Sequence, residues 1–92
     1  MASAMAKHLL VKHKEQAEEL KQRLSKGESF EVLAKKHSIC NSAKRGGDLG
    51  EIRVGQLVRS VEQVIFQKPV DKVHGPVKSK FGFHLIVVYY RD

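Results

Sequence analysis

The stretch FGFHLIVVYY, residues 81–90, decides the fold of this chain. Its last six side chains, Leu85 to Tyr90, leave no polar face, which is typical of a strand buried on both sides. We therefore expect this strand at the centre of a sheet. Its beginning differs, because Gly82 stands between two phenylalanines and His84 follows them. We expect Gly82 to allow a sharp turn that directs Phe81 to a pocket rim and His84 into the sheet.

The remaining segments predict a small antiparallel sheet covered by helices, which is an α+β fold. Alternating apolar residues indicate strands, and apolar residues at helical spacing indicate helices. Ser29 is a candidate helix N-cap, and Gly27 is a candidate C-terminal cap. The expected elements are a strand in 7–14, helices in 15–27, 29–38 and 54–67, a loop in 41–51 with a short strand at 48–52, and strands in 73–80 and 81–90.

Length and composition fit one small globular domain, since the chain has 92 residues, of which 41% are hydrophobic and 29% charged. We assign residues 1–6 to a flexible leader or cloning remnant and residues 7–92 to a single domain. No apolar run approaches the roughly 20 residues that cross a bilayer, and no secretory signal is present, so we expect a cytoplasmic protein without membrane contact. The single cysteine excludes an internal disulfide, and the five histidines lack metal-binding spacing, so we expect no metal.

The formal net charge of +7 raises the question of nucleic-acid binding. The basic residues are spread from Lys7 to Arg91, with local concentrations only at 35–37 and 44–45. A surface of this kind more often aids solubility or attracts acidic partners than it reads a nucleic-acid sequence. We therefore expect at most non-specific nucleic-acid contact.

Two histidines and the cysteine are the candidates for a functional site. His8 and His84 lie near the ends of the first and last strands, so pairing of these strands would bring both imidazoles together. Taken singly, each is more typical of a hydrogen-bonded core histidine. Cys40 is a half-buried thiol, a pocket-lining group or, less favoured, a nucleophile beside a histidine. Apolar residues near these positions indicate a ligand-facing cleft: Leu49, Ile52, Leu57, Val61 and Phe81.

Two longer segments resemble a known family. AKKHSICNSAKRGGDLGEIRVGQLV (34–58) and GPVKSKFGFHLIVVYYRD (75–92) resemble the parvulin family of peptidyl-prolyl cis/trans isomerases, above all its minimal single-domain bacterial type. The likeness covers the chain from about Lys7 onward. It implies a four-stranded antiparallel sheet wrapped by about four helices. It also implies an active site of His8, Cys40 and His84 beside a proline pocket that the five apolar residues above would form, with Phe81 at its edge.

The sequence departs from the family pattern at the pocket. Leu57 stands where the family commonly has methionine, and Val61 stands where it has an aromatic ring that stacks on proline. Val61 offers less area and no flat face, so we expect either weaker catalysis than in close relatives or a proline held instead by Phe81 or another side chain. The long basic loop and the WW domain of the phosphate-selective members are missing, so we expect no phosphoserine-proline preference. Lys44 and Arg45 would instead favour an acidic residue before proline.

The resemblance implies an isomerase that speeds rotation about X–Pro bonds in peptides and unfolded proteins. Rotation makes and breaks no covalent bond, so we expect a non-covalent mechanism and no cofactor. A monomer is the default expectation. Two other functions stay open. The domain would be a chaperone-like binder of extended proline-containing peptides with weakened catalysis, or its basic surface would bind nucleic acid or an acidic partner.

Overall fold

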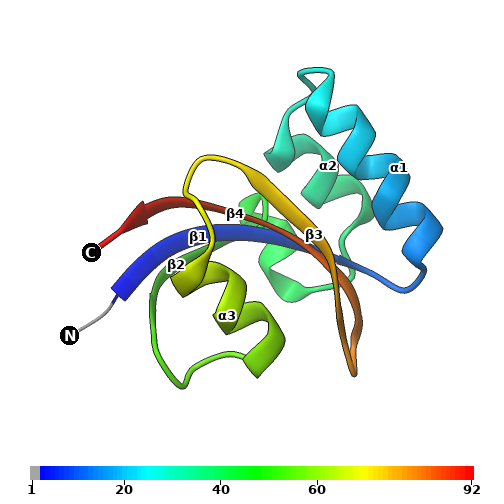
Figure 1. Cartoon of the computed structure of the whole chain (residues 1–92). Helices are drawn as coiled ribbons and strands as arrows, with labels where there is room; N and C mark the ends of the chain where they lie inside the picture. Colours follow the sequence, from blue (N-terminus) through cyan, green and yellow to red (C-terminus); the bar gives the residue numbers. More distant parts are fainter. Residues whose placement is uncertain (1–2) are drawn as a thin grey trace.

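The structure, a computed structural model, describes residues 3–92. Four strands form one antiparallel sheet in the order β2-β1-β4-β3, and three α-helices and one 3-10 helix surround it (Figure 1). This confirms the expected four-stranded antiparallel α+β fold. In chain order the elements are β1 (Ser3–Val11), α1 (Lys14–Ser25), α2 (Phe30–His37), η1 (Asn41–Arg45), β2 (Asp48–Arg53), α3 (Arg59–Gln67), β3 (Val73–Ser79) and β4 (Gly82–Arg91).

The first and last strands form the centre of the sheet, and the apolar run in 81–90 predicts this place for the last strand. β1 and β4 pair along their length, from Ala4 opposite Arg91 to Val11 opposite Phe83. The apolar run is not buried to its end, however, because Tyr89 and Tyr90 are 36% and 54% exposed. A register shift between Met5 and Ala6 interrupts the pairing there, and the Tyr89 hydroxyl donates to Asp48 at 2.9 Å. A tyrosine keeps its hydroxyl satisfied at a surface more easily than in a core.

Residues 3–6 belong to the sheet, which corrects the expectation of a flexible leader over 1–6. Ser3 pairs with Arg53 of β2, and both Ala4 and Ala6 are fully buried. Residues 1 and 2 lie outside the described part of the chain. This part of the strand was not visible in the sequence because residues 3–6, Ser-Ala-Met-Ala, are neither β-branched nor aromatic.

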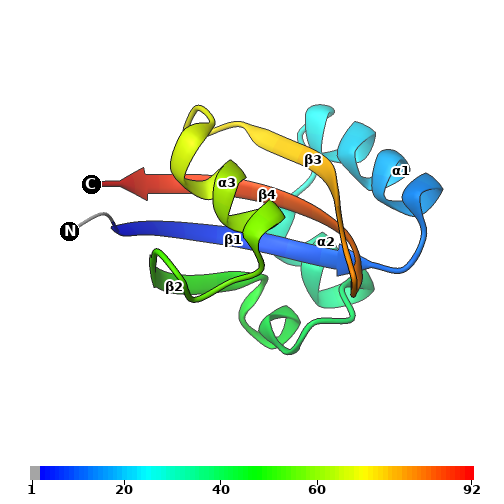
Figure 2. The same cartoon turned by 60° about the horizontal axis from the view of Figure 1, so that its bottom comes forward.

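The two faces of the sheet carry separate apolar clusters. α3 covers one face, and α1 and α2 cover the other (Figure 2). The α3 side packs Ala4, Ala6, Ile52, Val61, Val64, Ile65, Ile86 and Val88, and the α1/α2 side packs Leu9, Val11, Ala17, Leu20, Leu33, Ala34 and Leu85. No helix within residues 3–92 is both long and apolar enough to cross a membrane.

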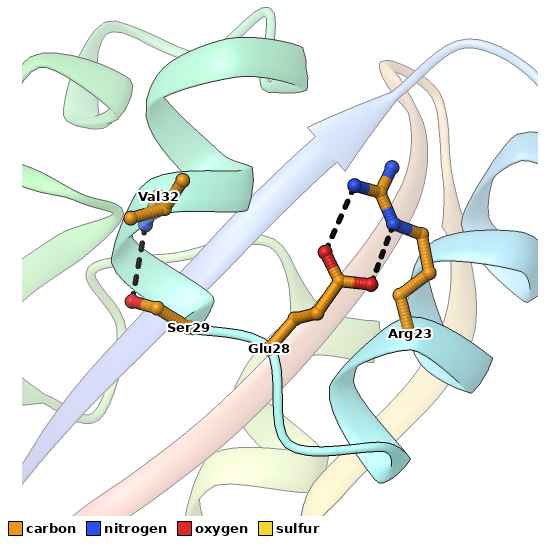
Figure 3. A network of polar contacts seen from close by, with 4 residues as sticks. All are labelled: Arg23, Glu28, Ser29 and Val32. Atoms are coloured by element: carbon orange, nitrogen blue, oxygen red, sulfur yellow. Dashed lines mark hydrogen bonds and ion pairs between the residues drawn. The ribbon is translucent and has the colours of Figure 1, made fainter.

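The connection between α1 and α2 is fixed by local hydrogen bonds (Figure 3). The Gly27 and Glu28 amides donate to the carbonyls of Leu24 and Arg23, which is the Schellman pattern expected of a glycine after a helix. The Ser29 hydroxyl accepts from the Val32 amide at 3.3 Å, which confirms Ser29 as the N-cap of α2. The Arg23 guanidinium also donates two hydrogen bonds of 2.9 Å to the Glu28 carboxylate.

α3 begins at Arg59, five residues later than the helix expected over 54–67. The Glu62 side chain reaches back and accepts a hydrogen bond from the Gly55 amide at 2.6 Å, while Val58 is extended. This contact holds residues 54–58 as a turn rather than as a first helical turn. Leu57 and Val58 therefore precede the first residue of α3, and both line the cavity over the histidines.

Candidate active site

His8 and His84 meet on the face of the sheet that α3 covers. Leu10 pairs with His84 and His8 pairs with Ile86, so the two imidazoles are diagonal neighbours on adjacent strands. Their Nδ1 atoms are 3.3 Å apart, and the rings stack with centroids 5.4 Å apart and planes 18° apart. The residues are only 6% and 4% exposed. The expected pairing of the two histidines is therefore present.

Each histidine makes a second polar contact, so four side chains form a chain of hydrogen bonds. His8 Nε2 lies 3.3 Å from the Cys40 Sγ, and His84 Nε2 lies 2.7 Å from the Ser79 Oγ. A neutral imidazole has one N–H and one lone pair. If one ring donates at Nδ1 the other must accept there, so the protons along the chain all point towards Cys40 or all towards Ser79. The tautomers of His8 and His84 are therefore coupled.

Both imidazoles are held in the neutral form by their surroundings. Burial, assisted by the charge on His84, lowers the pKa of His8 to about 4. Burial also lowers the pKa of His84. A buried charge without a counter-ion is costly, which is the physical cause in both cases. The pair thus forms a polar but uncharged floor at neutral pH.

The segment from Ser38 to Gly47 places Cys40 against His8. The Ser38 hydroxyl accepts from the Leu10 amide at 3.0 Å and from the Cys40 amide at 3.3 Å. At the other end of the segment, the His8 amide donates to the Gly47 carbonyl at 2.9 Å. A Cβ on Gly47 would lie 2.3 Å from the His8 carbonyl oxygen, and Gly47 has a φ of +85°. Only glycine permits this approach, which explains the second glycine of GGDLG.

Gly82 has a comparable role on the other side of the site. Its φ is +142°, and a Cβ there would lie 2.4 Å from the Val11 carbonyl oxygen. The turn before it is held by the Ser79 hydroxyl, which accepts from the Phe81 amide at 3.2 Å. The expected sharp turn is therefore present, and it places Phe81 beside the cavity while His84 enters β4.

An apolar cavity of about 250 Å³ lies directly over the histidine pair. It is smaller than the roughly 300 Å³ at which pockets for drug-sized ligands begin, and it therefore suits one side chain or ring. Its lining consists of His8, Leu10, Cys40, Leu57, Val58, Val61, Phe81 and His84. Six of the eight residues that the sequence indicates are thus brought together at one site.

Leu49 and Ile52 do not line this cavity. Ile52 is 2% exposed and sits opposite Ala4, at the far end of β1 from His8, and Leu49 packs against the same core cluster. Leu10 and Val58 line it instead. The position of Leu10 was readable, because it shares a strand face with His8. Val58 was hidden by the wrong start of the third helix.

The two serines that support the histidines and the cysteine were also missed. Ser38 and Ser79 act through hydroxyl groups, and a serine gives no periodic signal in a sequence. Lys44 and Arg45, which the sequence analysis considered for an acidic residue before proline, do not line the cavity. The Arg45 Nε instead donates to the Asp48 carbonyl at 3.3 Å.

Comparison with known proteins decides the family. The rotamase family described as the PPIC-type PPIase domain matches residues 4–89. The chain belongs to the PPIC-type peptidyl-prolyl isomerases. The parvulin resemblance noted in the sequence is thereby confirmed.

PPIC-type relatives and structures agree with this membership. The chain is 43% identical over 84 residues to foldase protein PrsA 1 of Bacillus cereus, covering 90% of this chain and 29% of that protein. It is 43% identical over 82 residues to foldase protein PrsA of Bacillus subtilis, covering 88% and 28%. The chain thus spans less than a third of the curated relatives it matches.

Among solved structures, PrsA from Bacillus anthracis superposes with a TM-score of 0.95 at 33% identity, covering 99% of this chain and 42% of that one. NmPin, the parvulin of Nitrosopumilus maritimus, superposes with a TM-score of 0.88 at 35% identity, covering 98% of both chains. The PPIC-type domain therefore occurs both as part of larger proteins and with almost the extent seen here.

Acid is expected to destabilise the domain through the histidine pair. Because the folded pKa of His8 lies below its ordinary 6.5, the folded state binds fewer protons, and stability is full above pH 6.5 and is lost as pH falls towards 4. A tenfold change in proton affinity is about 1.4 kcal/mol, so His8 accounts for a loss of about 3 kcal/mol over this window. Urea unfolding at pH 7.5, 5.5 and 4.0 measures it. A variant with leucine at both His8 and His84 should lose most of the dependence; an equal dependence there would assign it to carboxylates instead.

Proposed function

We propose that this domain catalyses cis/trans rotation about X–Pro bonds by a non-covalent mechanism. The observation that supports this best is the apolar cavity of about 250 Å³ over a neutral, hydrogen-bonded imidazole pair. The cavity has room for a proline ring. Its polar side chains, His8, Cys40 and His84, lie together at the floor, and the other lining residues are apolar. Family membership as a PPIC-type isomerase agrees with the proposal.

The physical task is to favour a twisted amide over a planar one. The uncatalysed barrier is about 20 kcal/mol, because the C–N bond loses its double-bond character during rotation. The twisted amide is less dipolar than the planar amide, so an apolar cavity disfavours it less. Holding the proline ring while the preceding carbonyl turns binds the transition state more strongly than the ground state. A reduction of about 5 kcal/mol in the barrier would speed rotation by nearly four decades.

The side chains divide into two groups by the part of the substrate they face. Leu57, Val61 and Phe81 contact the ring, with Phe81 as the aromatic side chain of the lining. The neutral His8–His84 pair forms the floor of the cavity and orients the neighbouring polar groups. Cys40 lies beside the carbonyl that rotates. Phe81 is 55% exposed, so a bound peptide would cover it.

Turnover on a panel of X–Pro peptides tests the function. Exchange between cis and trans forms is measured by NMR for peptides in which X is acidic, basic, apolar or phosphorylated. We expect acceleration of all of them, with no requirement for the phosphorylated residue. Absence of any acceleration by the folded domain would overturn the proposal.

Replacement of Cys40 by serine is expected to reduce kcat/KM by less than about tenfold, because the serine hydroxyl would keep a small polar group beside His8 while removing the nucleophilic sulfur. The same NMR exchange assay measures the effect, and thermal unfolding confirms that the variant is folded. Complete loss of activity in a folded Cys40→Ser variant would instead indicate covalent attack by the thiol.

A second function, binding of unfolded chains with little catalysis, is favoured by Val61 alone. Valine is smaller than the aromatic residue common at this position and has no flat face to stack on proline. Relatives named foldase are compatible with either function. A proline-limited refolding assay separates them, because affinity for the unfolded chain without acceleration of its slow phase would select the binder.

A further inference from the structure

A second, larger hollow adjoins the cavity over the histidines. It has a volume of about 570 Å³ and is open to solvent. Leu57 lines both hollows, so its side chain is the wall between them. The second hollow, which we call the α3 groove, is lined by Val54, Gly55, Leu57, Arg59, Glu62, Gln63, Phe66 and Gln67.

The α3 groove holds one cation, Arg59, that forms no ion pair with a side chain within residues 3–92. In this part of the chain the ion pairs are Lys7–Glu31, Arg23–Glu28 and Arg53–Glu51, and Arg59 is in none of them. The acidic side chain of the groove, Glu62, is directed to the Gly55 amide, from which its Oε2 accepts at 2.6 Å, and it forms no ion pair with Arg59. The other polar side chains of the lining are neutral amides. The guanidinium of Arg59 is therefore available to a ligand.

The floor of the groove is apolar in two places. Phe66 packs its ring partly against the core cluster under α3, and Val54 is 62% exposed although it is apolar. An extended peptide that crosses Leu57 would cover these surfaces with its own side chains. Because the α3 groove is continuous with the proline cavity at Leu57, we take its occupant to be the residues that flank the proline in the same substrate.

We infer that the α3 groove binds the substrate segment beside the proline and that Arg59 selects an acidic side chain in that segment. The role of the groove rests on the isomerase function proposed above, since its ligand is the same polypeptide. Arg59 thus takes the place that Lys44 and Arg45 were expected to fill. An Arg–carboxylate contact has the geometry of two parallel hydrogen bonds, which favours a glutamate or aspartate over a neutral amide.

Lys80 is the competing candidate for such a contact. It lies at the rim of the proline cavity, where its ammonium is 5.2 Å from the centre of the Phe81 ring. A cation over an aromatic face is already stabilised there. Arg59 has no comparable partner among the described residues, so we assign the acidic preference to it and use Lys80 as a discriminating variant.

A matched peptide series tests the assignment. Each peptide has one proline flanked by glutamines, and one glutamine at a time is replaced by glutamate from three positions before to three positions after the proline. The measured quantity is the ratio of kcat/KM for the glutamate peptide to that for the all-glutamine peptide, obtained by NMR exchange at low salt. We expect a ratio of about two to five at positions on one side of the proline, the range for an exposed ion pair.

Variants then identify the residue responsible. The ratio should fall to about one in Arg59→Gln, in accord with a single exposed ion pair. In Arg59→Glu it should invert, so that a lysine peptide is preferred; a purely structural role of Arg59 would not produce this inversion. Lys36→Gln, which removes an exposed charge from α2, is the matched control and should keep the ratio of the unchanged protein.

Two outcomes would overturn the assignment. One is a ratio of about one at every position in a protein that does isomerise the all-glutamine peptide. The other is loss of the ratio in Lys80→Gln but not in Arg59→Gln. No isomerisation of the all-glutamine peptide would instead count against the proposed function itself, so the two failures are distinguishable.

Discussion

The single replacements His8→Leu and His84→Leu are expected to destabilise the domain by more, when their effects are added, than the double replacement of both residues does. The single variant leaves the buried Nδ1 of His84 without its partner at 3.3 Å, and a buried unpaired polar group costs about 1–3 kcal/mol. When both rings become leucine, no Nδ1 is left unpaired. The free energies of unfolding should therefore be non-additive by about 1–2 kcal/mol, with the double variant less destabilised than the sum.

Urea unfolding of the two single variants, the double variant and the unchanged domain at pH 7.5 completes this cycle. His13→Leu provides the matched control, because His13 is exposed and its side chain makes no capping hydrogen bond. Its effect should add to that of His8→Leu. Additivity of the His8 and His84 effects would contradict the hydrogen-bonded pair. All variants at the pair should also lose at least about tenfold in kcat/KM, a loss of about 1.4 kcal/mol in transition-state stabilisation.

Replacement of Gly47 by alanine is expected to be among the most destabilising single changes in the domain. The new Cβ would lie 2.3 Å from the His8 carbonyl oxygen and 3.2 Å from the Ala34 Cβ, at a φ of +85°. Relief would require β1 and the loop to separate, which would break the hydrogen bond from the His8 amide to the Gly47 carbonyl. We expect a loss of about 3 kcal/mol or more in the free energy of unfolding, which only strained or clashing core changes reach.

Gly50→Ala is the matched control for this change. Gly50 belongs to the same GGDLG segment, within β2, and also has a positive φ, +69°, but a Cβ there would meet nothing within 4 Å. It should therefore show only the backbone cost of about 1–2 kcal/mol. Chemical denaturation of both variants measures the difference. Equal losses at Gly47 and Gly50 would show that the close approach to His8 does not contribute.

The sheet centre and the histidine pair could be predicted because each depends on one clear local pattern. The apolar run from Leu85 to Val88 required burial on both faces and so predicted a central place for β4, whereas its pairing with β1 is supplied by the structure. Once those two strands pair, the strand ends that carry His8 and His84 coincide. The family resemblance added Cys40 to the same site, and the structure places it 3.3 Å from His8.

Other parts could not be predicted because they depend on contacts between distant residues. The start of α3 is set by the Glu62 carboxylate on the Gly55 amide, and without it the spacing of apolar residues indicates a longer helix. Residues 3–6 are strand only because β2 and β4 flank them. Leu49 and Ile52 had the right polarity for a pocket, but β2 lies on the far side of β1 from β4 and turns them to the core.

The central position of β1 and β4 also determines when the proposed site can form during synthesis of the domain. The two imidazoles are separated by 76 positions in the chain, and the strand that carries the second one leaves the ribosome after the other three strands. Until then only β1 and β2 can pair, because β3 has β4 as its sole neighbour in the sheet. Contacts of such long range slow folding. A domain of this topology therefore folds late, and the proposed site is complete only when the last strand has paired.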